Sequence, residues 1–127
     1  MYCIVLITGS VELPSLIKRG EDVDSQLKRG LLEYCVLAFL LPEPSYGYEI
    51  IKHISPIIHI SESTLYPILK RLENQQLVTT YKEEYSGRLR KYYRITAKGE
   101  EKLRIFYKGK DSVVGIYEYI GGRLENG

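Results

Sequence analysis

The fold of this chain is decided by the stretch Ser61-Glu62-Ser63-Thr64-Leu65-Tyr66-Pro67-Ile68-Leu69-Lys70-Arg71-Leu72-Glu73. Its first hydroxyl side chains can accept hydrogen bonds from the free N–H groups of a helical first turn. Helical spacing gathers four aliphatic side chains on one face, namely Leu65, Ile68, Leu69 and Leu72. The opposite face carries Ser63, Tyr66, Pro67, Lys70 and Arg71. Hydroxyls, a phenol and cations are groups that bind phosphates and base edges, so the pattern predicts a recognition helix, although most such helices only present their cations to water.

Charge is unevenly distributed along a chain whose net charge is only +2. The segment between Ser86 and Gly99 contains no Asp or Glu and carries Arg88, Arg90, Lys91, Arg94 and Lys98. A local basic patch on a near-neutral protein indicates a surface for a polyanion. At 127 residues, 44% of them hydrophobic, the chain is long enough for one folded domain with an appended element.

Other classes of function find little support in the sequence. Cys3 and Cys35 are isolated thiols without metal-ligand spacing, which predicts a reducing, cytoplasmic environment. His53 and His59 have no third ligand at metal spacing, so we expect neither a metal nor another cofactor. No nucleophile–base pair or phosphate-binding loop occurs, so we expect no enzymatic activity. No apolar run approaches about 18 residues, so we expect no membrane partner.

The N-terminal part divides into an extension and a helix. Residues 1–24 show no periodic pattern and are expected to be weakly ordered. A helix is predicted over about residues 26–41, with Asp24 or Ser25 as its cap. Apolar side chains cover nearly all of its sides, so it is expected both to form the core and to meet a second subunit. The residues expected at that subunit contact are Leu32, Val36 and Phe39.

A second helix is predicted to begin with Ser45 as its N-cap and to end before Pro56. Gly47 lowers helix propensity in its first turn, which suggests a close approach there by another backbone or by a ligand. A short apolar linker, residues 55–60, leads directly to the stretch quoted above. Two helices joined so closely predict a helix-turn-helix.

Strand-like segments follow at residues 77–81 and 92–95, which are rich in β-branched and aromatic residues. Ser86 and Gly87 between them form a turn signal, so the pattern predicts a β-hairpin. A helix-turn-helix followed by a hairpin is a winged helix. The predicted fold class is therefore mainly α with a small β-hairpin, with a further helix at the C-terminus for dimerisation.

The C-terminal helix is expected to start at Ala97 with Thr96 as its cap. Glycines at 109, 115, 121 and 122 are expected to weaken or break it. Its later apolar residues have nothing left to pack on in one small subunit, so we expect a dimer interface at Leu103, Phe106, Val113, Tyr117 and Ile120. The expected division is an extension over 1–24, a winged-helix domain over 25–99 and a dimerisation helix over 100–127.

Four runs of sequence, at residues 25–33, 45–50, 63–73 and 87–99, resemble motifs of the PadR-like family of transcriptional regulators. They include SQLKRGLLE, SYGYEI, STLYP and GRLRKYY, and they occur in the family's order. The resemblance implies a winged-helix homodimer, usually a repressor, that binds inverted-repeat operator DNA and is released by a small ligand or stress signal. The implied partners are double-stranded DNA, a second copy of the chain and a small-molecule effector.

The DNA contacts expected on this basis are Ser63, Thr64, Tyr66, Pro67, Lys70, Arg71, Gly87, Arg88, Arg90 and Lys91. Two alternatives stay open, because Tyr66 could belong to the core and Arg71 could pair with a helix acid. Strand alternation lets only one of Lys91 and Tyr92 face DNA, and we expect Lys91. Tyr46 and Tyr48 could line an effector pocket or be ordinary core tyrosines.

A rival interpretation is a winged helix used only for protein–protein contact, without DNA binding. A protein-binding wing has no need of the five cations around residues 86–99, which favours the DNA-binding interpretation.

Overall fold

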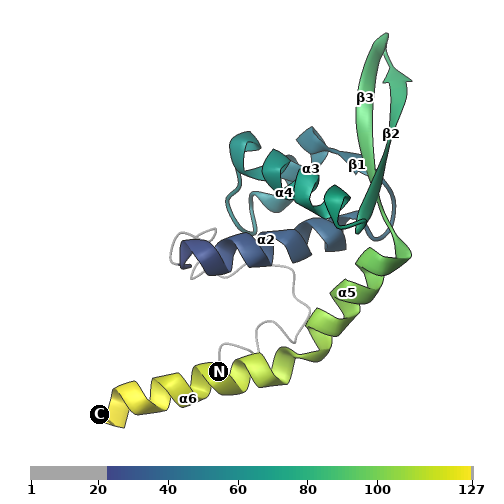
Figure 1. The fold of residues 1–127 in the computed structure, drawn as a ribbon. Coiled ribbons are helices and arrows are strands. Elements are labelled where there is room, and N and C mark those ends of the chain that lie inside the picture. Colours follow the sequence, from purple (N-terminus) through teal and green to yellow (C-terminus); the bar gives the residue numbers. More distant parts are fainter. Residues whose placement is uncertain (1–22, 127) are drawn as a thin grey trace.

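The computed structural model describes residues 23–126 and has the predicted class of fold, mainly helical with one small sheet (Figure 1). Its elements are α2 (Ser25–Leu40), β1 (Ser45–Tyr46), α3 (Gly47–Ile54), α4 (Glu62–Asn74), β2 (Val78–Tyr85), β3 (Arg88–Ile95), α5 (Ala97–Lys108) and α6 (Lys110–Asn126). We call α2 to α5 the body and α6 the arm, which is joined to α5 and runs below α2 toward the N-terminal end of that helix in Figure 1. The extension expected over residues 1–24 lies almost wholly outside the described residues.

Helix α2 forms the centre of the body's core. The Asp24 carboxylate caps it by accepting hydrogen bonds from the N–H groups of Gln26 at 3.0 Å and Leu27 at 3.3 Å. Leu32 and Val36 are 1% and 0% exposed within the single subunit. The expectation that these two side chains meet a second subunit is therefore wrong, because the chain's own core already encloses them.

The segment before α3 is a strand and not the helix start that was expected. Ser45 pairs with Tyr93, and Tyr46 with Tyr92, which adds β1 to the edge of the hairpin in the order β1-β3-β2. The N-cap of α3 is consequently Tyr46, one residue later than expected, and the helix begins at Gly47. Backbone pairing with β3 prevailed over the preference of Ser45 for an N-cap, because a partner strand satisfies the buried backbone groups of this segment.

A close approach does occur at Gly47, and a side chain makes it. A Cβ atom on Gly47 would lie 2.3 Å from the hydroxyl oxygen of Tyr66 in α4. A larger residue at position 47 would displace the Tyr66 ring from its place against the start of α3. Gly47 thus permits this position of the Tyr66 side chain.

Helix α4 buries the aliphatic face predicted from its spacing. Its buried residues are Leu65, Ile68, Leu69 and Leu72. They join a core that also includes Ile50 and Ile54 of α3 and Val78 of β2. Each fully buried side chain of this kind contributes roughly 1.5–3 kcal/mol of transfer free energy. The core therefore holds α4 by one face and leaves its other face to solvent.

The hairpin is longer than the sequence pattern suggested. Its register runs without a break from Val78 opposite Ile95 to Tyr85 opposite Arg88. Ser86 and Gly87 make the turn with φ of 52° and 79°, the left-handed pair of a type I′ turn. This turn matches the twist of paired strands, so pairing continues through polar residues that carry no strand signal of their own.

The C-terminal region bends at Gly109 and does not end there. The Thr96 hydroxyl oxygen accepts from the Gly99 N–H at 3.0 Å, and α5 begins at Ala97 as expected. Gly109 terminates α5, but α6 continues to Asn126 through the three later glycines. No residue of α6 is buried. Within residues 23–126, no helix combines the length and apolar character needed to cross a membrane.

Candidate nucleic-acid interface

The outer face of α4 is a polar stripe in solvent. Helical spacing places Ser63, Pro67 and Lys70 opposite the buried leucines, and all three are exposed. Asn74 continues the stripe one turn beyond Lys70 and is also exposed, although sequence reasoning did not include it. The signal was available in the i, i+4 spacing past the end of the quoted stretch. An Asn amide and a Lys ammonium are base-reading groups when a helix enters the major groove.

The N-terminus of α4 carries a hydroxyl cluster. Ser61 occupies the N-cap position, but its side chain does not accept from the first turn as the sequence suggested. Its Oγ atom instead contacts Ser63 Oγ at 3.0 Å and donates to Thr64 Oγ1 at 3.2 Å. Three hydroxyls at the positive end of a helix dipole form a suitable surface for a phosphate.

Tyr66 and Arg71 lie on opposite flanks of the stripe. Tyr66 is 46% exposed, so it is not a core residue, and its ring packs toward Gly47. Arg71 forms an ion pair with Glu33 of α2. The alternative in which Arg71 pairs with an acid is therefore the observed one. Its partner comes from another helix, 38 residues earlier, and not from α4 itself.

The wing has two faces with different side chains. Lys91 shares a face with Tyr93 and points toward α4, where its Nζ lies 3.8 Å from Glu73 Oε1. Lys91 nevertheless stays exposed, because Tyr93, at 5% exposure, marks where the core ends. Burial, and then the neighbouring Tyr66 and Glu73, raise the pKa of the Tyr93 hydroxyl. Strand alternation places Arg88 and Arg90 on the opposite face.

Arg90 is held in a cluster of tyrosines. Its guanidinium lies 4.1 Å from the ring centroids of both Tyr46 and Tyr85. A hydrogen bond from Arg90 to Tyr92 is the main cause that raises the pKa of the guanidinium. Tyr92 also stacks on Tyr81 with a centroid separation of 5.3 Å. Sequence reasoning missed this tyrosine cluster, although the even spacing of Tyr81 and Tyr85, which puts both on one face of β2, was a usable signal.

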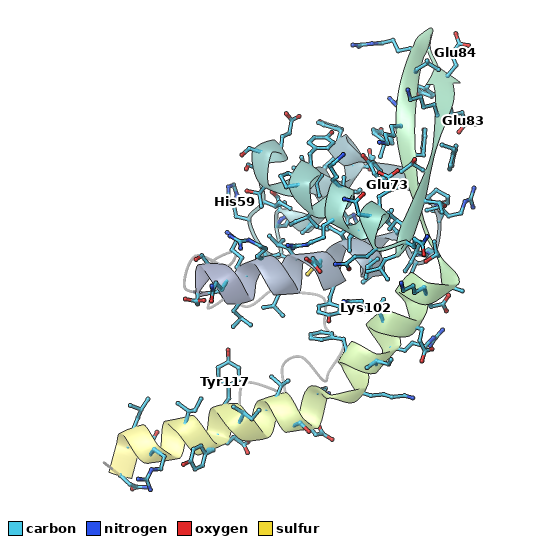
Figure 2. All side chains as sticks on the ribbon, in the orientation of Figure 1. His59, Glu73, Glu83, Glu84, Lys102 and Tyr117 are labelled. Atoms are coloured by element: carbon cyan, nitrogen blue, oxygen red, sulfur yellow. The ribbon has the colours of Figure 1, made fainter. Side chains whose placement is uncertain are left out.

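The basic patch is less uniform in space than in sequence. Glu83 lies opposite Arg90 in the strand register, and Glu84 lies opposite Leu89, so β2 brings two carboxylates to the wing (Figure 2). The arginines of the wing and Lys91 belong to β3, and Lys82 lies on β2 opposite Lys91. Since β1 pairs only with Tyr92 and Tyr93, the edge of β3 from Arg88 to Lys91 is open. Any polyanion is expected to approach along that open edge.

Tyr46 and Tyr48 do share a hollow, of about 620 Å³, at the junction of α3, α4 and the wing. The hollow is also lined by Gly47, Tyr66, Arg90, Lys91 and Tyr93. Two cations and several phenols give it an anion-binding character, and Tyr48 at its rim is 64% exposed. The hollow therefore combines residues that were expected to contact DNA with the two tyrosines that were expected to line an effector pocket.

The residues expected at the dimer interface fall into two groups. Leu103 is half-buried against the body's core, and Phe106 stacks on Tyr34 of α2 with centroids 3.8 Å apart. On the arm, apolar side chains repeat at helical spacing with 46–78% exposure: Val113, Tyr117, Ile120 and Leu124. Figure 2 shows the Tyr117 ring projecting away from α6. Exposed apolar side chains in such a row indicate a surface that awaits a partner.

Metal-binding geometry is not found in the described part of the chain, where no three His, Cys, Asp or Glu residues cluster. His53 lies against the Phe39 ring, 4.7 Å between centroids, and His59 is exposed on the linker before α4.

Comparison with known proteins places this architecture in a family. Residues 36–105 match the model of the transcriptional regulator PadR-like family. The chain belongs to the PadR-like family. A Lysinibacillus sphaericus relative named uncharacterized protein X is 40% identical over 108 residues, which are 81% of this chain and 99% of the relative.

Solved structures share the fold. A PadR family transcriptional regulator from Eggerthella lenta is 35% identical, with a TM-score of 0.65 over 80% of this chain and 88% of its own. The protein smu.1704 from Streptococcus mutans is 44% identical, with a TM-score of 0.64 over 71% of this chain and 89% of its own. The winged helix described above is thus the fold of a family of transcriptional regulators.

Proposed function

We propose that this PadR-like protein is a repressor that binds an inverted-repeat operator as a homodimer and is released by a small-molecule ligand. The observation that carries the proposal is the polar stripe of α4 beside the open edge of β3. Ser63, Lys70 and Asn74 project from a helix whose other face is fully engaged in the core. Such a helix can place its polar face in a major groove while its contacts with the core stay intact.

The DNA contacts divide into two kinds. Lys70 and Asn74 would read bases in the major groove, where each good bidentate contact contributes about 1–3 kcal/mol of discrimination. Ser63, Thr64 and the β3 cations Arg88 and Lys91 would bind phosphates, with Gly87 allowing the wing to reverse beside the backbone. Tyr66, Pro67 and Arg90 would border the contact. Arg71 is left out of this set because Glu33 already engages it.

The homodimer would be formed by the arm. Val113, Tyr117 and Ile120 lie along one side of α6 and are about half exposed. A two-fold pair would set the α4 helices about one turn of duplex apart, near 34 Å, so that both enter successive major grooves. Phe106, partly exposed on the body, would extend this interface, whereas Phe39 lines a separate cavity and is left out of it.

A titration of fluorescent DNA with the full chain tests the proposal. The specific probe is the promoter segment upstream of the protein's own coding sequence, and a shuffled duplex of the same composition is the control. We expect tighter binding to the promoter, with a logarithmic salt slope of roughly −0.9 for each phosphate neutralised. Equal and salt-independent retention of both probes, or no binding at 50 mM salt, would favour the protein–protein module instead.

A further inference from the structure

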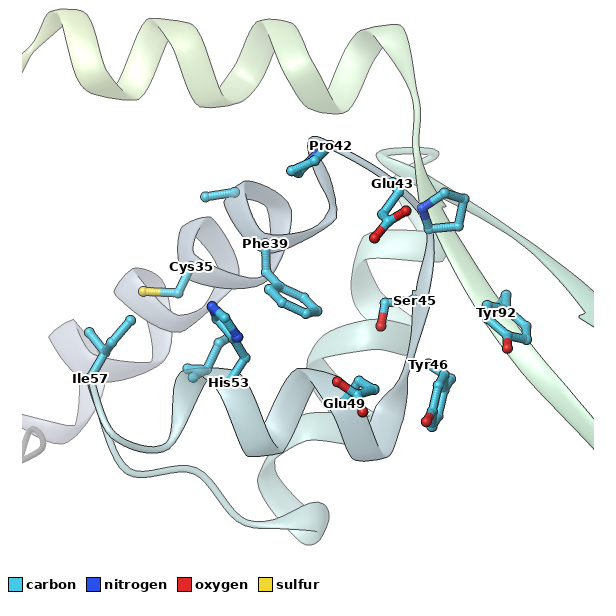
Figure 3. Close-up of a pocket in the computed structure, with 13 residues that line it drawn as sticks. Cys35, Phe39, Pro42, Glu43, Ser45, Tyr46, Glu49, His53, Ile57 and Tyr92 are labelled. Carbon is cyan, nitrogen blue, oxygen red and sulfur yellow. The ribbon is translucent and has the colours of Figure 1, made fainter. Parts of the chain in front are cut away.

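A second cavity, of about 750 Å³, lies on the body away from the α4 stripe (Figure 3). It is formed by the C-terminal end of α2, the loop before β1, α3 and the sheet. Its size falls within the range of cavities that hold drug-sized ligands. Nothing in the DNA-binding proposal uses it.

The side chains around this cavity are polarised. One end, formed by Glu43, Glu49, Tyr46 and Tyr92, is acidic and aromatic, whereas Cys35 and Ile57 line the apolar end (Figure 3). Phe39 lies between the ends, with the His53 ring tilted against it. Burial raises the pKa of the Cys35 thiol, so the thiol stays protonated and serves as an apolar wall and not as a nucleophile.

The Asp, Glu, Lys and Arg side chains that line the cavity are two carboxylates, and the cation Arg90 lies on the wing side of Tyr46. No Lys or Arg is among its lining residues. The carboxylates of Glu43 and Glu49 take part in no ion pair with any described residue, whereas Glu33, Glu73 and Glu100 each have a basic partner. Carboxylates beside aromatic rings are groups that bind an organic cation, since the faces of the rings are negative.

We propose that this cavity binds an organic cation with an apolar, aromatic body, and that this molecule is the ligand that releases the protein from DNA. The second part of the proposal rests on the function proposed above. The carboxylates hold the positive charge near Tyr46, while Phe39, Cys35 and Ile57 accept the apolar body. An anion of the same shape is excluded by the two carboxylates.

Tyr46 connects the cavity to the wing. It lines both this cavity and the hollow beside α4. The Arg90 guanidinium lies 4.1 Å from the centroid of the Tyr46 ring. The Tyr46 ring also makes an edge contact with the Tyr92 ring, with the two centroids 5.5 Å apart. A ligand cation against the same ring competes with Arg90 for it, so occupancy loosens Arg90 and alters the β3 edge that faces DNA. Coupling of this kind is reciprocal, and DNA must weaken ligand binding by the same factor.

Two ions of nearly equal shape and opposite charge test the site. Calorimetric titration of the full chain with tetraphenylphosphonium should show saturable binding, and titration with tetraphenylborate should show none. Glu43→Gln and Glu49→Gln should each weaken phosphonium binding by roughly two- to fivefold, the scale of a solvent-exposed ion pair. Glu84→Gln, which removes a carboxylate from the wing tip, should leave it unchanged. Equal binding of both ions, no binding of the phosphonium ion, or unchanged affinity in both cavity variants would overturn the proposal.

A second titration separates the site from the proposed function. Tetraphenylphosphonium should lower promoter-DNA affinity at least fivefold for the wild-type chain and less for Glu49→Gln, within the usual range of coupling. Selective phosphonium binding with unchanged DNA affinity would overturn the link through Tyr46. If the chain binds the phosphonium ion but no DNA, the cavity assignment stands and the repressor proposal fails. If it binds promoter DNA but not the phosphonium ion, only the cavity assignment fails.

Discussion

The body and the arm handle apolar residues in opposite ways. The body encloses its aliphatic side chains almost completely, and Leu65, Leu69 and Leu72 are at most 1% exposed. The arm has no buried residue at all, and its Ile116, Tyr117 and Leu124 are 57–78% exposed. One chain thus contains a region that is complete by itself and a region that has apolar surface without a covering layer.

This difference indicates which region of the chain needs a second subunit to cover its apolar surface. Stability of the body comes from contacts within one subunit and should not depend on protein concentration. The arm can remove its apolar surface from water only by association, so its contribution should depend on concentration. The exposed stripe of α4 is a third case, because it is polar and needs no partner for stability.

Truncation of one leucine in each region should give the largest contrast. Leu69→Ala in the body is expected to lower the free energy of unfolding by about 2–5 kcal/mol, because it leaves a cavity in a packed core. Leu124→Ala on the arm removes the same atoms and should change the free energy of unfolding by less than about 0.5 kcal/mol at low protein concentration. Urea unfolding monitored by circular dichroism measures both. A similar loss in the two variants would mean that the arm packs on its own body.

Charge on the arm should break association without harming the body. Ile120→Asp is expected to weaken the dimer by at least thirtyfold, about 2 kcal/mol, because a carboxylate would be buried in an apolar contact. Sedimentation equilibrium measures the change. Glu118→Gln, on the opposite side of α6, is the matched control and should leave association unchanged. A dimer that survives Ile120→Asp would place the interface elsewhere.

The features that could be predicted from the sequence are local in the chain. The aliphatic face of α4 follows from helical spacing, and the turn at Gly87 follows from the residue types at two adjacent positions. The errors concern distant partners. Ser45 pairs with Tyr93, which no pattern near Ser45 announces. Likewise, α2 is apolar on nearly all sides, and the sequence cannot tell which sides its own subunit covers, so a contact of Leu32 and Val36 with a partner is predicted in addition to the core.

The candidate site was predictable to a similar degree. The exposed stripe with Ser63 and Lys70 could be derived from one helix. The placement of Arg90 among Tyr46, Tyr85 and Tyr92 could not, because it requires the register of three strands and the path of a long side chain. The shared hollow at Tyr48 likewise needs α3, α4 and the wing in place at once.

Removal of single cations should separate the polar stripe from the apolar arm. Lys70→Ala and Arg88→Ala are each expected to weaken promoter binding and to reduce the salt slope by about 0.9 per subunit, because fewer counterions are released. Neither should change the dimer or the free energy of unfolding. Lys108→Ala at the end of α5 removes an equal charge away from the stripe and is the control. Unchanged salt slopes for both variants would remove these residues from the DNA interface.

The smallest effect is expected where α4 is tied to α2. Arg71→Gln and Glu33→Gln should each lower the free energy of unfolding by under about 1 kcal/mol, since the arginine is 44% exposed and water screens the pair. A double-mutant cycle should show coupling between them, because the two side chains act as one contact. Promoter affinity should change equally in both single variants if the pair only orients α4 on the body. A loss of affinity confined to Arg71→Gln would instead assign the guanidinium to DNA, and the polar stripe would then extend to the α2 side of the recognition helix.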